Sequence, residues 1–241
     1  MSPIVAAAVP AVLFFALIFG IWHYQRRQRA MRPPAGKSGG EAVPAAFADE
    51  PDFPLPFGYS SQWFAVRTTD TRAVADLLRL NGRQRANWRT GLAGADAGYC
   101  FVTPPVNGWT LVIQPAMPEL TGDGQSGPLP ALEALSRAFG EACYFGTHRV
   151  VGYRAWARSV DGVIVRGFAY AGSGAIVFDR GEPSEEERTD NRLFTGPEAA
   201  DPVFPDEEDV RRIAGLWSVD PAMAQGGYTR GTGIIGVLRT S

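Results

Sequence analysis

The 241-residue sequence predicts an α+β protein, with one N-terminal transmembrane helix followed by a single domain that has a mainly antiparallel sheet and three or four helices. Three observations predict this class. The chain opens on an uncharged apolar run, most of the rest consists of short β-rich segments separated by turn residues, and a few segments place apolar residues at helical spacing. Antiparallel strands with a few helices among them make the class α+β.

The opening run, residues 3–22, is apolar throughout and carries no charge. As a helix, about 20 residues span about 30 Å, the thickness of the hydrocarbon core of a bilayer. The basic residues come after this run, and no small-residue cleavage site follows it, which is unlike a cleaved signal peptide. The sequence therefore predicts a retained transmembrane helix over residues 3–24.

Charge predicts the orientation of this helix. Four arginines follow it closely, whereas its N-terminal side offers only the α-amino group. By the positive-inside rule the N-terminus lies outside and the C-terminal bulk in the cytoplasm, which makes the chain a single-pass protein of the cell (inner) membrane. The residues expected at the membrane interface are Trp22, Tyr24, Arg26, Arg27, Arg29 and Arg32.

Composition divides the remainder into three parts. Residues 25–58 are a basic juxtamembrane segment and a flexible linker rich in Pro, Gly and Ala, with the alternative that its end packs on the domain as an extended strap. Residues 59–223 are predicted to be the globular α+β domain. Residues 224–241 are a Gly-rich tail, in which GTGIIG (231–236) has dinucleotide-motif spacing but no following helix, so a loose tail or an edge strand is expected.

The first half of the domain is predicted to contain three strands and two helices. The stretch QWFAVRT (62–68) alternates and is rich in β-formers. A helix over 70–81 follows, with Asp70 as its N-cap and Asn81-Gly82 as its C-terminal signal. Residues 86–94 form a short helix, and residues 98–102 and 109–114 are two strands joined by the turn TPPVNG.

The second half begins with an amphipathic helix over 130–139 that ends at Gly140, followed by a strand over 141–148. A hairpin over 149–172 turns at Asp161-Gly162, the strongest two-residue turn signal in the chain. A strand over 175–181 comes next. The last helix covers 205–217, and Asp206 with its acidic first turn marks where it starts.

The hairpin turn predicts which of its residues share a face. Counting outward places Trp156 opposite Gly167 and Tyr153 opposite Tyr170, and the face with Tyr153 is the better core. The other face is expected to point to solvent or to another element. Its cationic and aromatic side chains are the candidate site for an anionic group or a partner protein, namely His148, Arg154, Trp156 and Arg158. The alternative is an ordinary exterior in which the tryptophan shields a glycine.

Few residues here serve catalytic or metal chemistry. His148 is the only histidine beyond the membrane junction and the chain has two cysteines, so multi-histidine and four-cysteine zinc sites are excluded. No catalytic residue, metal ligand or cofactor is predicted. Cys100 and Cys143 are expected to be reduced core residues. The acidic stretches GEPSEEER (181–188) and PDEEDV (205–210) are expected to be solvated first turns of helices rather than an ion site.

Beyond residue 40 there are 18 basic residues, once the five juxtamembrane ones are set aside, against all 25 acidic ones, a formal charge of −7. Such a domain is a poor nucleic-acid binder, so the expected partners are the bilayer, through the N-terminal helix, and another protein.

Three functions of different classes follow as hypotheses. The first is a membrane-tethered, non-catalytic protein-interaction module, either associated with the envelope or similar in charge to bacterial toxin-neutralising proteins. The second is a hydrolase-like enzyme with a carboxylate-based site, for instance Asp179 with Glu182. The third is a structural envelope assembly protein whose working part is the transmembrane helix itself.

Overall fold

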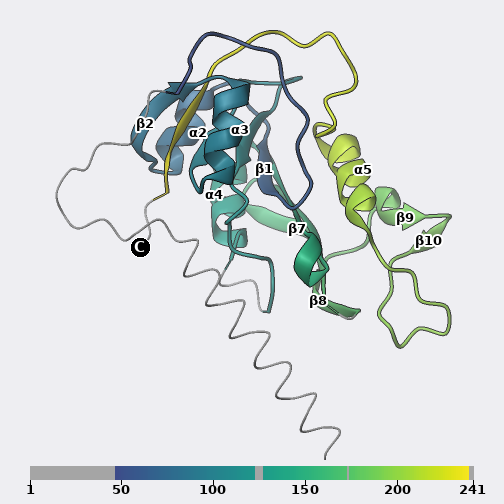
Figure 1. Ribbon diagram of the computed structural model, residues 1–241. Helices are drawn as coiled ribbons and strands as arrows, with labels where there is room; N and C mark the ends of the chain where they lie inside the picture. Colours follow the sequence, from purple (N-terminus) through teal and green to yellow (C-terminus); the bar gives the residue numbers. More distant parts are fainter. Residues whose placement is uncertain (1–46, 123–126, 173, 239–241) are drawn as a thin grey trace, which may run out of the picture. The chain divides into compact units, whose positions relative to one another are not determined.

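The computed structural model describes residues 47–122, 127–172 and 174–238 (Figure 1). The chain divides into Met1–Ala42 and a compact unit, Val43–Ser241. The predicted transmembrane helix (3–24) and its interface residues lie outside the described residues. Within the described ranges, no helix has both the length and the apolar character needed to cross a bilayer.

The compact unit is built on one nine-stranded sheet in which every neighbouring pair of strands is antiparallel, which confirms the single domain with a large antiparallel sheet. In spatial order the strands are β2 (Asn81–Ala86), β11 (Gly233–Val237), β3 (Cys100–Val102), β4 (Thr110–Ile113), β1 (Gln62–Val66), β5 (Glu141–His148), β6 (Tyr153–Val160), β7 (Val163–Ala171) and β8 (Ala175–Arg180). A separate two-stranded ribbon consists of β9 (Arg188–Thr189) and β10 (Arg192–Leu193).

Four helices cover the two faces of this sheet, two on each face (Figure 1). On one face, α2 (Thr71–Leu77) lies against β3 and β11, and α4 (Leu129–Phe139) against β1 and β5–β7. On the other, α3 (Trp88–Asp96) lies against β2, β3 and β11, and α5 (Glu207–Trp217) against β5 and β6. Each face therefore carries its own apolar core, and neither is an open exterior.

Helices α2, α3 and α5 begin at residues whose side chains cap them, and α4 begins after Pro128 without a side-chain cap. Asp70 accepts from the Ala73 amide at 2.9 Å to start α2, as predicted, and Asn87 accepts from the Thr90 amide at 3.0 Å to start α3. The predicted end of α2 is wrong, because the helix stops at Leu77 and Arg79 takes a left-handed φ of 53°. Asn81-Gly82 then opens the edge strand β2.

The Gly-rich stretch assigned to a tail contains strand β11, which lies inside the sheet between β2 and β3. Ile235 is fully buried in this strand. Gly233 packs so closely on β3 that a Cβ atom there would lie 2.3 Å from the carbonyl oxygen of Val102. The glycines of this stretch thus permit close approach of backbones, where the sequence pattern indicated a loose end.

Residues 47–58, the end of the predicted linker, form an extended strap on the α3 side of the unit. The Asn87 amide donates to the Ala48 carbonyl at 2.8 Å, and the Phe57 amide donates to the Pro221 carbonyl at 3.0 Å. The Asp52 carboxylate accepts from the Trp88 amide at 2.6 Å, at the N-terminus of α3. The alternative of a packed strap therefore describes this segment.

Both cysteines are free and buried, and they belong to the cores on opposite faces of the sheet, Cys100 with α2 and α4 and Cys143 with α3 and α5. Burial raises the pKa of Cys100 from its ordinary value of 9.0 to about 12, and burial also raises the pKa of Cys143. Neither thiol is placed to react in the native protein.

We expect these thiols to make the domain sensitive to alkali. Below pH 9 both thiols are protonated in the folded and unfolded chain, so their contribution is fully present. As the pH rises above that value, the unfolded chain releases protons that the native one retains, and the free energy of unfolding falls by up to about 1.4 kcal/mol per pH unit and thiol. Urea unfolding between pH 8 and 10 measures this slope. A thiol-reactive dye should label neither cysteine before unfolding, and labelling at the same rate in both states would contradict the burial.

Candidate binding site

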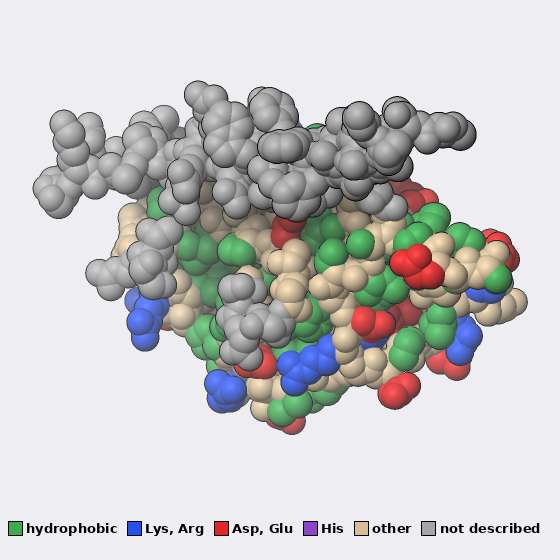
Figure 2. All heavy atoms as spheres, turned by 90° about the horizontal axis from the view of Figure 1, so that it is seen from below, with side chains coloured by type: hydrophobic (Ala, Val, Ile, Leu, Met, Phe, Trp, Pro, Cys, Tyr) green, Lys and Arg blue, Asp and Glu red, His purple; other side chains and the backbone are tan. Residues whose placement is uncertain are grey.

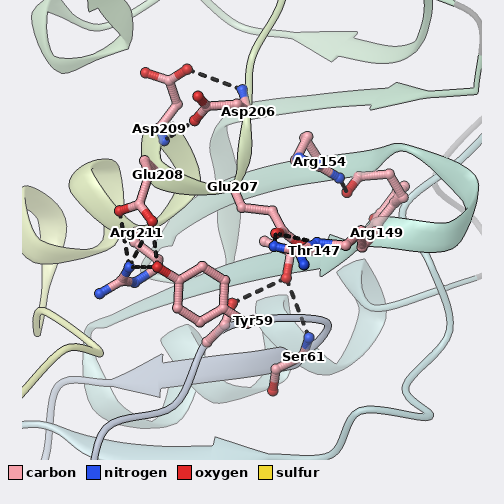
Figure 3. Close-up of polar contacts among 12 residues, drawn as sticks. Tyr59, Ser61, Thr147, Arg149, Arg154, Asp206, Glu207, Glu208, Asp209 and Arg211 are labelled. Atoms are coloured by element: carbon pink, nitrogen blue, oxygen red, sulfur yellow. Dashed lines mark hydrogen bonds and ion pairs between the residues drawn. The ribbon is translucent and has the colours of Figure 1, made fainter.

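A hollow lies where four segments meet, at the N-terminal end of α5. The end of the strap, η1 (Arg149–Val151), β6 and the start of α5 enclose a volume of about 640 Å³ (Figure 3). We call it the α5 pocket. Its lining combines an aromatic ring, two arginines and three carboxylates, and consists of Tyr59, Ser60, Arg149, Arg154, Asp206, Glu207 and Glu208.

The acidic wall of the α5 pocket is the first turn of α5. Asp206 is the N-cap and forms a capping box with Asp209, each side chain accepting from the other's amide, at 2.9 and 3.0 Å. Carboxylates are stabilised there by the positive end of the helix dipole. The prediction that PDEEDV starts a helix is thus confirmed, and the same turn presents Glu207 and Glu208 to the pocket.

Glu207 is the unusual member of this wall because its side chain is almost completely buried. In Figure 3 it points from α5 toward Thr147 and Arg149. One carboxylate oxygen, Oε2, accepts from Nε and Nη2 of Arg149 at 3.2 and 3.0 Å. The other, Oε1, is buried and has no hydrogen-bond partner, and the same is true of Nε of Arg154. Buried polar atoms without partners cost free energy, so the site is incompletely satisfied as it stands.

Tyr59 forms the aromatic wall and is about half exposed. Its hydroxyl donates to Glu208 and accepts from Arg211, and the Arg211 guanidinium lies 4.5 Å from the centre of its ring. The hydrogen bond to the Glu208 carboxylate raises the pKa of Tyr59. The ring follows directly on the strap, whose last residue is tied to β5, because the Thr147 hydroxyl donates to the Gly58 carbonyl at 3.0 Å. The ring is therefore held in position rather than placed on a free loop.

Of the four side chains predicted to form a binding face, the structure places only Arg154 in the α5 pocket. Of the two alternatives for the face that carries Trp156, solvent or another element, the second describes it, since the side chain is fully buried, stacks on Phe168 at 4.9 Å and packs on Phe194. The segment after β8 folds back over this face and covers it. Arg158 is held by Glu141, with Nε donating to Oε1 at 2.8 Å.

His148 lies on the other face of the sheet. It pairs with Tyr153 in the β5–β6 register, and paired residues share a face, so it is on the α4 side. There its Nδ1 lies 3.2 Å from Oε1 of Glu119. The four predicted residues therefore do not converge.

The hairpin also contains a register shift, which changes the β7 partners of β6 and leaves the faces of the β6 residues as predicted. Its turn is as predicted, with positive φ at Asp161 and Gly162 and Val160 paired with Val163. An irregularity between Arg158 and Ser159 then moves the pairing by one residue, so that Trp156 faces Phe168 instead of Gly167.

The other acidic stretch, GEPSEEER (181–188), also contains one buried glutamate. Glu187 belongs to a capping box with Ser184 in η2 (Glu185–Glu187), and it is 2% exposed. It accepts from Nε of Arg166 at 2.8 Å and from Nε1 of Trp156 at 2.9 Å. Burial acts to lower the pKa of Arg166, but hydrogen bonds to Glu187 and Asp179 outweigh it, and this pKa lies above its usual value. This ion pair fastens the segment after β8 to the sheet.

The expectation that both acidic stretches are solvated is therefore wrong for Glu187 and Glu207. A signal was present for Glu207, because it lies on the same helical stripe as the buried Val210, Ala214 and Trp217, at i+3, i+7 and i+10. Tyr59 gave none, since its role depends on the fold of the strap.

The carboxylate pair of the enzyme hypothesis does not form a free site. Asp179 accepts from Nη1 of Arg166, and Glu182 is exposed. Among the described residues, no group of three or more His, Cys, Asp or Glu is arranged to hold a metal ion. On the part of the surface that Figure 2 shows in colour, acidic and basic side chains lie interspersed among apolar and neutral ones.

Comparisons with protein-family models, with curated proteins and with solved structures find no match for this chain.

Proposed function

We propose that this chain is a single-pass membrane protein whose compact unit is a non-catalytic, cytoplasmic protein-binding module, and that the α5 pocket is its binding site. The observation that supports binding is the unsatisfied chemistry of the pocket: Glu207 and Arg154 each bury a polar atom that has no partner. A bound group that supplies a hydrogen bond to such an atom gains the free energy that its burial without a partner costs. The formal charge of −7 beyond residue 40 favours a basic partner.

The membrane part of the proposal rests on the uncharged run of residues 3–22 and on the arginines after it. Alkaline phosphatase fused to the C-terminus should be inactive, and green fluorescent protein at the same place should fluoresce. Replacing Arg26, Arg27, Arg29 and Arg32 with glutamine should reduce this preference, because it removes the charge asymmetry. An active phosphatase on the unaltered chain would contradict the orientation.

Binding at the α5 pocket is tested by site-specific photo-cross-linking in native membranes. A benzophenone amino acid at position 59, which is half exposed, should give an adduct with a partner protein. The same probe at Val163 is the matched control. Val163 is exposed and adjoins the far end of β6, which is about 20 Å from Arg154 at about 3.3 Å per residue.

The adduct at position 59 should disappear with Glu207→Gln, which keeps the shape of the side chain and removes its charge. Adducts of equal yield at positions 59 and 163, or an adduct indifferent to Glu207→Gln, would refute the pocket as the binding site. Deleting residues 1–42 separates this function from a purely structural role of the transmembrane segment. The deletion should release the protein from the membrane and leave the compact unit able to bind, since it stops short of the strap.

A further inference from the structure

We infer that the α5 pocket receives the guanidinium group of an arginine side chain from the partner protein, and that Arg149 occupies this position until the partner binds. The inference rests on the proposed function and specifies its ligand.

The Arg149–Glu207 pair is strongly asymmetric, with the arginine side chain 73% exposed and the glutamate 7%. Arg149 belongs to the three-residue turn η1, which ends at Gly152 in a left-handed conformation. Moving an exposed arginine back into water costs little, because surface ion pairs contribute at most about 1 kcal/mol. Leaving the Glu207 carboxylate buried without a cation costs much more. The site therefore needs a positive group but does not need this particular one.

The walls of the pocket suit a guanidinium better than an ammonium group. Glu207 has one oxygen used and one without a partner, and a guanidinium presents paired N–H donors that match both oxygens of a carboxylate. The Tyr59 ring beside it already stacks with one guanidinium, that of Arg211. A lysine would offer a strongly hydrated point charge that stacks less well and lacks the fork.

The surrounding charges single out Glu207 as the place where a cation can be exchanged. Asp206 and Glu208 are exposed at the rim beside it, and Glu208 is already paired with Arg211 at 2.9 Å, whereas the buried Glu207 is paired with the mostly exposed Arg149. When the guanidinium of an incoming arginine pairs with the Glu207 carboxylate, Arg149 is released into solvent. There it is free to pair with an acidic group of the partner. Arg149 is then a competitor of the ligand, and removing it should strengthen binding.

The test uses the full-length protein in detergent and three small probes: the N-acetyl amides of arginine, lysine and citrulline. Citrulline has the shape of arginine without its charge. Calorimetric titration should show binding of the arginine probe, weaker binding of the lysine probe and none of the citrulline probe. Arg149→Ala should raise the affinity for the arginine probe by about threefold or more, the value of a surface ion pair. Glu207→Gln should lower it by at least about tenfold.

Arg85→Ala is the control, since Arg85 lies on the β2 edge and its ion pair with Asp49 is exposed. This substitution should leave the affinity for the arginine probe unchanged. Thermal unfolding of each variant shows whether it is folded, and Glu208→Gln at the exposed rim provides a second, milder loss of affinity. Weaker binding by Arg149→Ala, or equal binding of citrulline and arginine, would overturn the inference. If these occur while the cross-link at position 59 still depends on Glu207, only the arginine assignment fails; if that dependence is also lost, the proposed function fails as well.

Discussion

Glu187→Ala should lower the free energy of unfolding by about 3–5 kcal/mol, a large share of the stability of a domain of this size. The substitution leaves Arg166, which is 5% exposed, with Asp179 as its remaining carboxylate and with its Nε donor unpaired. It also removes the acceptor of the Trp156 indole N–H. Removing one side chain of a buried ion pair takes away part of the charge compensation of the other. The free energy of unfolding should therefore fall by more than it does when any surface ion pair of the domain is removed.

Urea unfolding followed by tryptophan fluorescence measures this loss, with Asp201→Ala as the control. Asp201 accepts from Arg192 in an exposed pair near the same ribbon, and its replacement should cost no more than about 1 kcal/mol. Similar losses for the two variants would show that the buried pair does not fasten the segment after β8. A larger susceptibility of residues 181–205 to proteolysis in Glu187→Ala should accompany the loss.

A chain that ends at Arg230 should not fold at all. It lacks β11, which hydrogen bonds to β2 on one side and to β3 on the other and buries Ile235 against α3. Without this strand β2 has no neighbour, and both cores are open at one end. The expected result is the absence of a cooperative unfolding transition by circular dichroism.

The matched control ends at Leu238, just after β11 is complete, and should unfold like the full chain. Gly233→Val tests the same feature without a truncation, because its side chain would run into the Val102 carbonyl. A chain ending at Arg230 that retains a cooperative transition would mean that the stretch is a tail after all.

The sequence predicted the elements whose signals are local. Asp70 and the acidic turn after Pro205 mark helix starts, and Asp161-Gly162 marks a hairpin, because capping and turn formation depend on a few adjacent residues. Strand β2, with the sequence NGRQRA, was missed because an exposed edge strand has no apolar face to give it a period. Strand β11 was foreseen only as the alternative to a loose tail, and then as an edge strand, because nothing in its sequence shows that it has a neighbour on both sides.

The candidate site was predicted less well, since it depends on register and on distant contacts. One irregular pairing beside Ser159 shifted the register, so that Trp156 lies opposite Phe168 and not opposite Gly167. The segment after β8 covers a face of the sheet that the hairpin alone would expose. Arg154, which lines the α5 pocket, was among the predicted binding residues, because counting outward from the hairpin turn shows which face of its strand it occupies. Glu207 and Tyr59 meet it only because α5 and the strap arrive from opposite ends of the domain.

The place of β11 in the sheet has a consequence for synthesis of the protein on the ribosome. Strand β11, which joins β2 and β3 in the sheet, is synthesised long after both of them. Ala86 at the end of β2 and Gly233 at the start of β11 are about 150 residues apart in the sequence. Until then the nascent domain carries unpaired backbone on β3, a template for wrong strand pairing. A chaperone that shields this edge while translation proceeds would therefore raise the yield of native protein.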